Sequence, residues 1–255
     1  MLDKLCEEIK NQIKKNNMSK GKLLMIPTTL GESDVNMVIP VSVRRIIHNL
    51  DEFIVENTKT ARAFLKKMEI PTSQSDLKLH VLNKYTDEQK LHTFLEGCRN
   101  GTDIGLLSEC GCPGIADPGA EIARIAHQEN IQVSPLIGPS SILLALMGSG
   151  LNGQSFTFHG YLPKNKSELK NKIKEIEKKS ISDFQTQLFI ETPYRNNKLL
   201  ESLLILLNPN TSLCIACNLS ISEEFIKTKT VAEWRLSGNQ KIHKKPCIFL
   251  ICGQL

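Results

Sequence analysis

The sequence predicts an α/β fold in two domains. Short apolar runs alternate with amphipathic stretches along most of the chain, as in layered α/β proteins. At 255 residues, the chain is long enough for two modest domains that each bury a core. A Gly-Ser-Gly stretch at 148–150 interrupts the pattern. We therefore expect an N-terminal extension over 1–20, a first α/β domain over 21–151 and a second over 152–255.

Five apolar runs predict the strands of the first domain, at 22–27, 52–57, 77–83, 103–109 and 132–137. The intervening stretch 58–70 places Ala61, Phe64 and Leu65 on one helical face and stops at Pro71. Residues 118–130 and 138–150 each begin near a proline and are also expected to be helical.

The second domain has a similar but more mixed pattern. Strands are expected at 156–162, 186–192, 212–220, 225–234 and 247–253, with helices over 167–179 and 196–208.

Composition limits the function classes. The longest apolar runs fall short of the roughly 18 residues that span a bilayer, which indicates a soluble protein. The N-terminus shows no signal-peptide pattern, and the eight cysteines lie in apolar or glycine-rich contexts, so we expect reduced thiols in the cytoplasm. The formal charge of +5 permits a phosphate-bearing partner such as RNA without requiring one.

Turn-forming residues gather after four of the five strands of the first domain, in the stretches 27–33, 56–59, 108–119 and 138–141. If these strands are parallel, the loops share one edge of the sheet, where α/β proteins bind ligands. The loop SECGCPGIADPG at 108–119 holds three glycines and two prolines. Glycines allow close approach of the main chain to a ligand, although tight turns before a helix are the alternative.

These motifs resemble the tetrapyrrole methylase superfamily of class III S-adenosylmethionine-dependent methyltransferases, in the branch that methylates small-subunit ribosomal RNA. The loop at 108–119, the Gly-Pro-Ser turn at 138–140 and the stretch FTFHGYLP at 156–163 resemble its signature, in order and at compatible spacing. VENTKTARAFLKKMEIP at 55–71 and FIETPYR at 189–195 resemble two further motifs, and this chain is a short, divergent member.

The resemblance implies methyl transfer from S-adenosylmethionine by a homodimer, with the cofactor in a cleft between two α/β domains. It also implies a set of cofactor-binding residues at matched positions. These are Ser108, Glu109, Gly111, Pro113, Gly114, Ser140, Ser141, Leu162 and Pro163.

The chemistry needs little from the protein beyond alignment and exclusion of water, because a sulfonium carries an activated methyl group. Metal is not expected. A ribose hydroxyl is a weak nucleophile, and Glu56 and Glu109 are the candidates for a catalytic base. The chain has Asn57 and Lys59 where the family has aspartate and arginine, so the acceptor site matches less well than the cofactor site.

Other features have competing interpretations. Cys214 and Cys217 have metal-site spacing, but residues three apart on a strand face opposite sides, which favours buried structural cysteines. The lysine-rich stretches 164–179 and 241–245 either contact RNA or form solvated faces. His159 is expected to be packed or hydrogen-bonded. Tyr194 and Arg195 either contact a ligand by stacking and phosphate binding or pack at a helix start.

Three functional hypotheses follow. The first is methylation of a ribose 2′-oxygen in small-subunit ribosomal RNA. The second keeps the cofactor but has a small-molecule acceptor such as a tetrapyrrole. The third is a catalytically silent S-adenosylmethionine-binding or RNA-binding protein.

Overall fold

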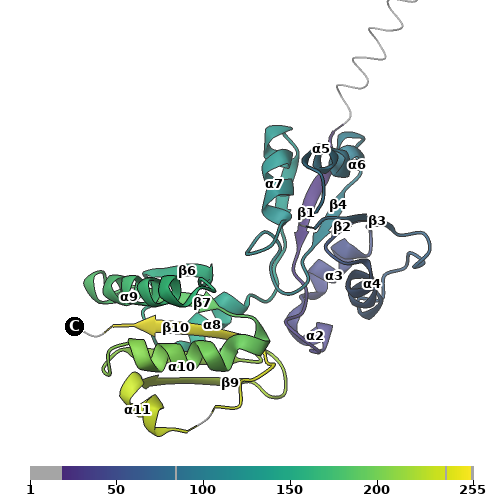
Figure 1. Cartoon of the computed structure of the whole chain (residues 1–255). Coiled ribbons are helices and arrows are strands. Elements are labelled where there is room, and N and C mark those ends of the chain that lie inside the picture. Colours follow the sequence, from purple (N-terminus) through teal and green to yellow (C-terminus); the bar gives the residue numbers. More distant parts are fainter. Residues whose placement is uncertain (1–18, 84, 239, 254–255) are drawn as a thin grey trace, which may run out of the picture. The chain divides into compact units, whose positions relative to one another are not determined.

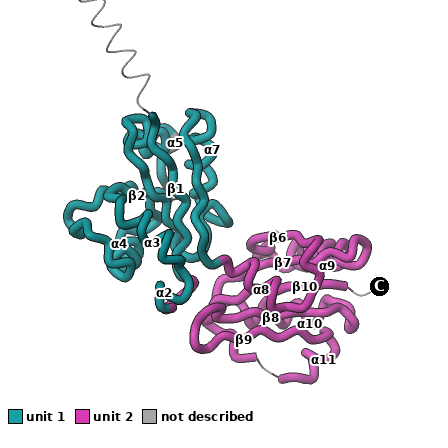
Figure 2. The backbone as a smooth tube through the Cα atoms, turned by 180° about the vertical axis from the view of Figure 1, so that it is seen from behind, with its two compact units in different colours: residues 1–29, 34–139 teal, residues 30–33, 140–255 magenta. Residues whose placement is uncertain are grey.

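The computed structural model describes residues 19–83, 85–238 and 240–253. The chain forms two compact units: unit 1 contains the chain up to residue 29 and residues 34–139, and unit 2 contains residues 30–33 and the chain from residue 140 (Figure 2). The predicted N-terminal extension lies outside the described residues except for residues 19 and 20, and Cys6 lies outside them as well.

The boundary between the units falls earlier than the expected position between residues 151 and 152. Helix α8 (Ser141–Ser149) buries Ala145 and Leu146 in a core cluster with residues of the second sheet, such as Leu188 and Leu250. Its buried side chains therefore assign the helix to unit 2, although the Gly-Ser-Gly stretch at 148–150 lies at its C-terminal end.

Unit 1 is built on a parallel sheet of order β3-β2-β4-β1-β5 (Figure 1). All five strands lie within the predicted runs: β1 (Lys22–Ile26), β2 (Glu52–Val55), β3 (Lys78–Val81), β4 (Ile104–Leu107) and β5 (Gln132–Pro135). The three central strands, β2, β4 and β1, are almost wholly buried, as expected for strands covered on both faces.

Helices cover both faces of this sheet. Side chains of α2 (Val35–Val38), α3 (Val41–Ile47) and α4 (Thr58–Lys67) share one core cluster with Leu24, Ile26 and Phe53. The other face carries η1 (His92–Leu95), α6 (Glu96–Arg99) and α7 (Gly119–Gln128), and the short helix α5 (Glu88–Leu91) lies beside η1. The helices predicted over 58–70 and 118–130 are thus confirmed as α4 and α7.

Unit 2 has a mixed sheet of order β6-β7-β10-β8-β9, in which only β6 and β7 pair in parallel. The strands are β6 (Phe156–Tyr161), β7 (Thr186–Ile190), β8 (Ser212–Cys217), β9 (Phe225–Thr230) and β10 (Cys247–Cys252). One face packs against α9 (Lys166–Ser182), α10 (Asn196–Leu206) and α11 (Val231–Leu236), and α8 covers the other. The single-turn helix η2 (Pro193–Arg195) precedes α10.

The expected strand over 225–234 is wrong in its second half. Thr230 ends β9 and begins α11: its side chain accepts a hydrogen bond from the backbone N–H of Glu233, whose carboxylate accepts one from the backbone N–H of Thr230. This reciprocal capping box starts a helix where β-branched residues suggested a strand.

The cysteines of the C-x-x-C sequence lie on β8, as expected. Cys214 packs in the cluster with α8, whereas Cys217 packs in the cluster with α9 and α10. The two thiols therefore face opposite sides of the sheet and cannot hold one metal ion together. Within the described residues, helices long and apolar enough to cross a bilayer are absent.

Candidate functional site

Unit 1 brings the predicted loops together. Its strands are all parallel, so the segments that follow β1, β2, β4 and β5 leave the same edge of the sheet. Two hydrogen bonds join the segments after β1 and β4: the backbone N–H of Thr28 donates to the carbonyl of Gly111 at 2.9 Å, and its hydroxyl donates to the carbonyl of Ser108 at 3.3 Å. The Cys112 thiol donates to the Pro139 carbonyl after β5 at 3.4 Å.

The loop 108–119 is held in shape by its own polar groups. The buried Ser108 hydroxyl donates to the carbonyl of Gly111 at 2.6 Å. One oxygen of Asp117, Oδ1, accepts the N–H groups of Gly114 at 2.6 Å and Gly119 at 2.8 Å. Burial raises the pKa of the Asp117 carboxyl, and these two amides oppose that shift. These hydrogen bonds hold the loop in one conformation, although the second carboxylate oxygen of Asp117 is buried without a hydrogen-bond partner among the described residues.

The glycines of this loop are required by its conformation. Gly111 and Gly114 have φ angles of 77° and 80°, which side chains rarely permit. A Cβ atom at Gly119 would lie 2.8 Å from Leu106 Cδ2 and 2.9 Å from Asp117 Oδ1. Gly111 and Pro113 are buried, whereas Glu109 is exposed and Gly114 half-buried. Among the predicted cofactor-binding residues, the buried Gly111 and Pro113 therefore shape the loop, whereas Glu109 and Gly114 are accessible at its surface.

The two predicted catalytic carboxylates meet at this edge. Glu56 follows β2 and accepts the backbone N–H of Glu109 at 3.2 Å. The Glu109 carboxylate accepts the hydroxyl of Thr60, from the first turn of α4, at 2.6 Å. Burial raises the pKa of Glu56, and the nearby carboxylates of Asp117 and Glu109 raise it further, against the lowering by the Glu109 amide.

Asn57 has a structural role that an aspartate would also fill. Its side-chain oxygen accepts the backbone N–H of Lys59 at 2.8 Å and caps the N-terminus of α4. Asparagine and aspartate cap helices about equally well, so the helix that carries Thr60 starts correctly with either residue.

The remaining predicted site residues belong to unit 2. Ser140 and Ser141 are half-buried at the start of α8. Leu162 is only 4% exposed and packs with the core under α9 and α10, while Pro163 is half-buried. Contact of Leu162 with a ligand would therefore use its backbone rather than its side chain.

Two further sequence features have structural roles. His159 is half-buried, and its Nε2 lies 2.7 Å from the side-chain oxygen of Gln187, so the expected hydrogen-bonded histidine is confirmed. Burial lowers its pKa. On the lysine-rich helix α9, Lys172 and Lys179 form ion pairs with Glu175, which neutralises part of that face.

Solved structures share this fold. The methyltransferase CobJ aligns with a TM-score of 0.61 over 91% of this chain and 94% of its own, at 16% identity. The uroporphyrin-III-C-methyltransferase from Thermus thermophilus aligns with a TM-score of 0.51 over 91% of this chain, 92% of its own and 15% identity. The two α/β units, with a glycine-rich loop at the edge of the first sheet, thus have the fold of these solved structures.

A family model identifies the family. The model of the Tetrapyrrole (Corrin/Porphyrin) Methylases matches residues 38–234, so the chain belongs to that family. It is 30% identical over 212 residues to "Ribosomal RNA small subunit methyltransferase I" of Vibrio cholerae, 83% of this chain and 69% of that protein. The protein of the same name from Halalkalibacterium halodurans is 30% identical over 76% of this chain and 64% of its own length.

Residues outside the predicted set complete the geometry. Thr28, Thr60 and Asp117 make the hydrogen bonds that connect the loops. Asp117 lies within the loop 108–119, but its spacing from Gly114 and Gly119 in the sequence does not reveal that one carboxylate oxygen accepts both backbone N–H groups. The role of Thr60 could not be predicted from the sequence, because it depends on the first turn of α4 lying beside Glu109.

Proposed function

We propose that the protein transfers a methyl group from S-adenosylmethionine to a ribose 2′-oxygen of small-subunit ribosomal RNA. Its family supports methyl transfer, and the similar proteins that carry the name of ribosomal RNA methyltransferases support the acceptor. The single observation that carries the proposal is the meeting of Glu56 and Glu109 beside the glycine-rich loop at the carboxyl edge of a parallel sheet.

The loop suits a cofactor of this kind. Gly114, where φ is 80°, has no side chain to hinder a ligand, and the hydrogen bond from its N–H to Asp117 pre-organises the backbone there. S-adenosylmethionine, when bound, supplies a methyl group already activated by its sulfonium. The proposed binding set is Ser108, Glu109, Gly111, Pro113 and Gly114 in unit 1, with Ser140, Ser141, Leu162 and Pro163 from unit 2.

The proposed bases are Glu56 and Glu109. A raised pKa makes Glu56 a stronger proton acceptor than an ordinary carboxylate when it is ionised. The Thr60 hydroxyl orients the Glu109 carboxylate by a 2.6 Å hydrogen bond. Either group would accept the proton of the ribose hydroxyl as the oxygen attacks the methyl carbon.

The family resemblance also supports a proposal for the assembly and its setting. We infer a homodimer in the cytoplasm that acts on the small ribosomal subunit or its RNA. Analytical ultracentrifugation of the full chain measures directly whether the protein is a dimer.

The function is tested by incubating the protein with labelled S-adenosylmethionine and small ribosomal subunits from cells that lack the native methyltransferase. We expect label on one ribose, found by mapping the modified nucleotide. The control variant is Gly111→Val, because valine is strained at a φ of 77° and should prevent binding of the cofactor.

The outcomes separate the hypotheses. Unlabelled subunits together with a labelled small-molecule extract would shift the acceptor to a small molecule. Cofactor binding without any formation of S-adenosylhomocysteine would indicate a silent binder. Full cofactor affinity in a folded Gly111→Val variant would show that the loop does not bind the cofactor.

A further inference from the structure

Loops of unit 2 gather at one edge of its sheet. Tyr161 near the end of β6 pairs with Ile190 at the end of β7, and Ile190 pairs in turn with Ile248 at the start of β10. Cys217 at the end of β8 lies opposite Cys247. The segments 162–165, 191–195, 218–224 and 241–246 therefore leave the sheet at the same edge.

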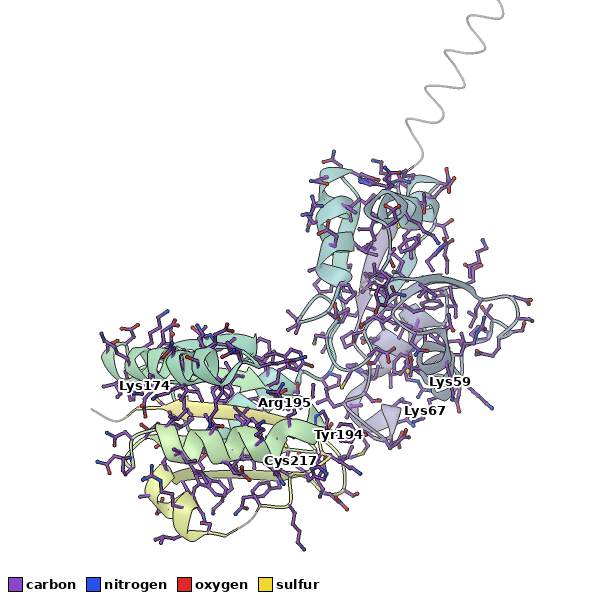
Figure 3. All side chains as sticks on the ribbon, in the orientation of Figure 1. Lys59, Lys67, Lys174, Tyr194, Arg195 and Cys217 are labelled. Carbon is purple, nitrogen blue, oxygen red and sulfur yellow. The ribbon has the colours of Figure 1, made fainter. Side chains whose placement is uncertain are left out.

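Tyr194, on the segment 191–195, is 72% exposed. Figure 3 labels it with Arg195 and Cys217 at this end of the unit. Its backbone is firmly held: the N–H of Lys244 donates to the carbonyl of Pro193 at 3.0 Å, and the fully buried Asn196 donates through Nδ2 to the carbonyl of Lys245 at 2.7 Å. The ring is thus presented to solvent on a fixed support.

Two side chains from the segment 241–246 flank the ring of Tyr194. The His243 ring stands edge-on to it, with centroids 6.4 Å apart and planes at 81°. The ammonium group of Lys244 lies 5.8 Å from the centroid of the tyrosine ring. Both flanking residues are exposed. We call these three residues, Tyr194, His243 and Lys244, the aromatic–basic cluster.

The charge around the cluster is positive. The segment 241–245 has three lysines and no carboxylate. Two neighbouring cations are balanced, because Arg195 lies 3.2 Å from Glu191 and Lys245 lies 2.7 Å from Glu223. Lys241 and Lys244 are exposed, and the ammonium group of Lys244 adds positive charge beside the ring.

We propose that the aromatic–basic cluster binds an unpaired nucleotide of the RNA acceptor. A base would stack on the ring of Tyr194, and Lys244 would contact a phosphate beside it. Exposed aromatic rings next to cations are the usual means of binding single-stranded nucleic acid, because every base has a face that can stack. The inference rests on the proposed function, since it assigns that acceptor a binding site.

The location supports an acceptor site. Tyr194 follows the end of β7, and His243 and Lys244 precede the start of β10. Leu162 and Pro163, which we propose to contact the cofactor, follow β6 at the same edge of the sheet. Neighbouring strands are about 4.8 Å apart, and β7 lies between β6 and β10. Only about 10 Å therefore separates the end of β6 from the start of β10. A nucleotide on Tyr194 would therefore lie within a few nucleotides of a base or ribose held near Pro163.

The test measures direct binding, independently of activity. The probe is small-subunit ribosomal RNA, free of protein and purified from cells that lack the native methyltransferase, in filter-binding titrations at several salt concentrations. The variants are Tyr194→Ala, Tyr194→Phe and Lys244→Gln. Their matched controls are Tyr85→Ala and Lys90→Gln, which change an exposed tyrosine and an exposed lysine in unit 1. S-adenosylmethionine affinity is measured for every variant as a check on folding.

We expect Tyr194→Ala to weaken RNA binding about tenfold through loss of stacking, and Tyr194→Phe to bind like the unaltered protein. Lys244→Gln should weaken binding and reduce the dependence of log K on log salt by about one. Both controls should bind normally.

Equal RNA affinity in Tyr194→Ala and Tyr85→Ala would overturn the inference, as would absence of RNA binding by the unaltered protein. A loss seen with whole subunits but not with protein-free RNA would also overturn it, because the partner would then be a ribosomal protein. The proposed function fails separately: if the unaltered protein leaves subunits unmethylated while Tyr194→Ala still weakens RNA binding, the cluster binds RNA and the reaction assignment is wrong.

Discussion

Glu56 is a site residue that lowers the free energy of unfolding at neutral pH. The pKa of its carboxyl is raised above the ordinary value of 4.5, first by burial and then by the carboxylates of Asp117 and Glu109. When the pKa is higher in the folded state, the stabilising contribution is present below the unfolded pKa and is lost as pH rises through the folded pKa. At neutral pH the ionised Glu56 therefore weakens the fold.

Glu56→Gln should raise the free energy of unfolding at pH 7, because the amide keeps an acceptor for the Glu109 N–H and removes the charge. The gain should shrink below pH 4, where glutamate is protonated as well. Methyl transfer should fall at the same time, a common conflict between activity and stability. Urea denaturation across this pH range, alongside the transfer assay, measures both effects.

The matched control is Glu201→Gln, which removes an exposed carboxylate from α10. It should change neither stability nor transfer by much. A Glu56→Gln variant that is less stable than the unaltered protein at pH 7 would mean that the hydrogen bond from Glu109 outweighs the repulsion and burial.

The site residues that the sequence predicted were those with strong local signals. Glycines such as Gly111 and Gly114 mark the loop because few other residues adopt their φ angles. The roles of Thr28 and Thr60 depend on contacts with residues about 50 to 80 positions away along the chain. The cluster of Tyr194 with His243 is equally non-local, and side-chain spacing on one element cannot reveal it.

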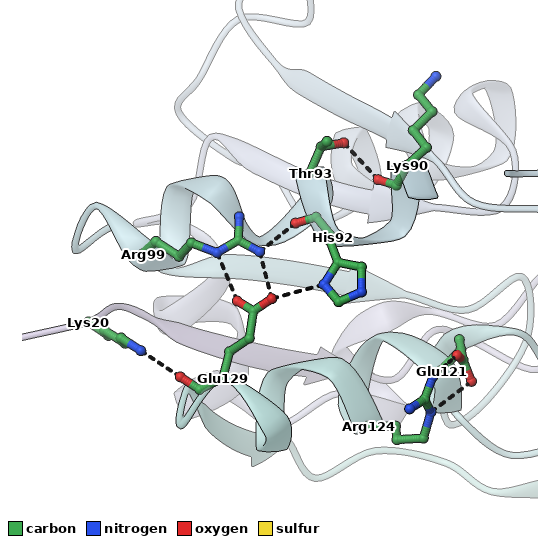
Figure 4. A network of polar contacts seen from close by, with 8 residues as sticks. All are labelled: Lys20, Lys90, His92, Thr93, Arg99, Glu121, Arg124 and Glu129. Carbon is green, nitrogen blue, oxygen red and sulfur yellow. Dashed lines mark hydrogen bonds and ion pairs between the residues drawn. The ribbon is translucent and has the colours of Figure 1, made fainter. Parts of the chain in front are cut away.

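At the scale of the element, a polar network ties the end of α7 to η1 and α6 (Figure 4). Both oxygens of Glu129 accept hydrogen bonds from Arg99, at 2.8 and 2.7 Å, and Oε1 lies 3.1 Å from Nδ1 of His92. Arg99 also donates to the carbonyl of His92 at 2.7 Å. These bonds lower the pKa of Glu129, mainly through Arg99.

Glu129→Gln should therefore destabilise the protein by about 1 kcal/mol at pH 7, because a two-pronged pair with arginine is stronger than an ordinary surface ion pair. Since the folded pKa is lowered, the contribution is present above the unfolded value of 4.5 and is lost as pH falls through the folded pKa. Thermal unfolding at pH 7 and at pH 3 measures this.

The unaltered protein and the variant should converge at the acidic end. A difference that stays constant with pH would show that Glu129 acts through packing or geometry rather than through its charge.

Element prediction succeeded where hydrophobic periodicity was clear, as in α4 and β4. It failed where a side-chain cap overrides local preference, as at Thr230, where the capping box turns the chain into α11. The short helices α2, α5 and α6 were not foreseen, since one turn of helix is too brief for a period to show.

At the scale of the whole molecule, each unit has its own core. Phe249 is fully buried in unit 2 and stacks on Phe189, with ring centroids 6.0 Å apart. Phe53 is fully buried in unit 1 and packs with residues of β1 and α4. The two rings make a matched pair for testing whether the cores are independent.

Phe249→Ala should destabilise unit 2 by about 3–5 kcal/mol through lost burial and a cavity. Amide hydrogen exchange should accelerate in β8 and β10 and remain slow in β1 and β4. Phe53→Ala should produce the reverse pattern. Equal acceleration in both sheets for either variant would mean that the units unfold as one.

Leu30 and Gly31 belong to unit 2 although the sequence places them between β1 and α2 of unit 1. Leu30 is 8% exposed and packs in the cluster with Leu219 and α8, and a Cβ atom at Gly31 would lie 3.1 Å from Ile221. A fragment that begins at residue 140 would lack the part of the unit 2 core that Leu30 supplies. A fragment that ends at residue 139 would expose Leu30 to solvent. A single cut between residues 139 and 140 therefore separates unit 2 from one segment of its own core.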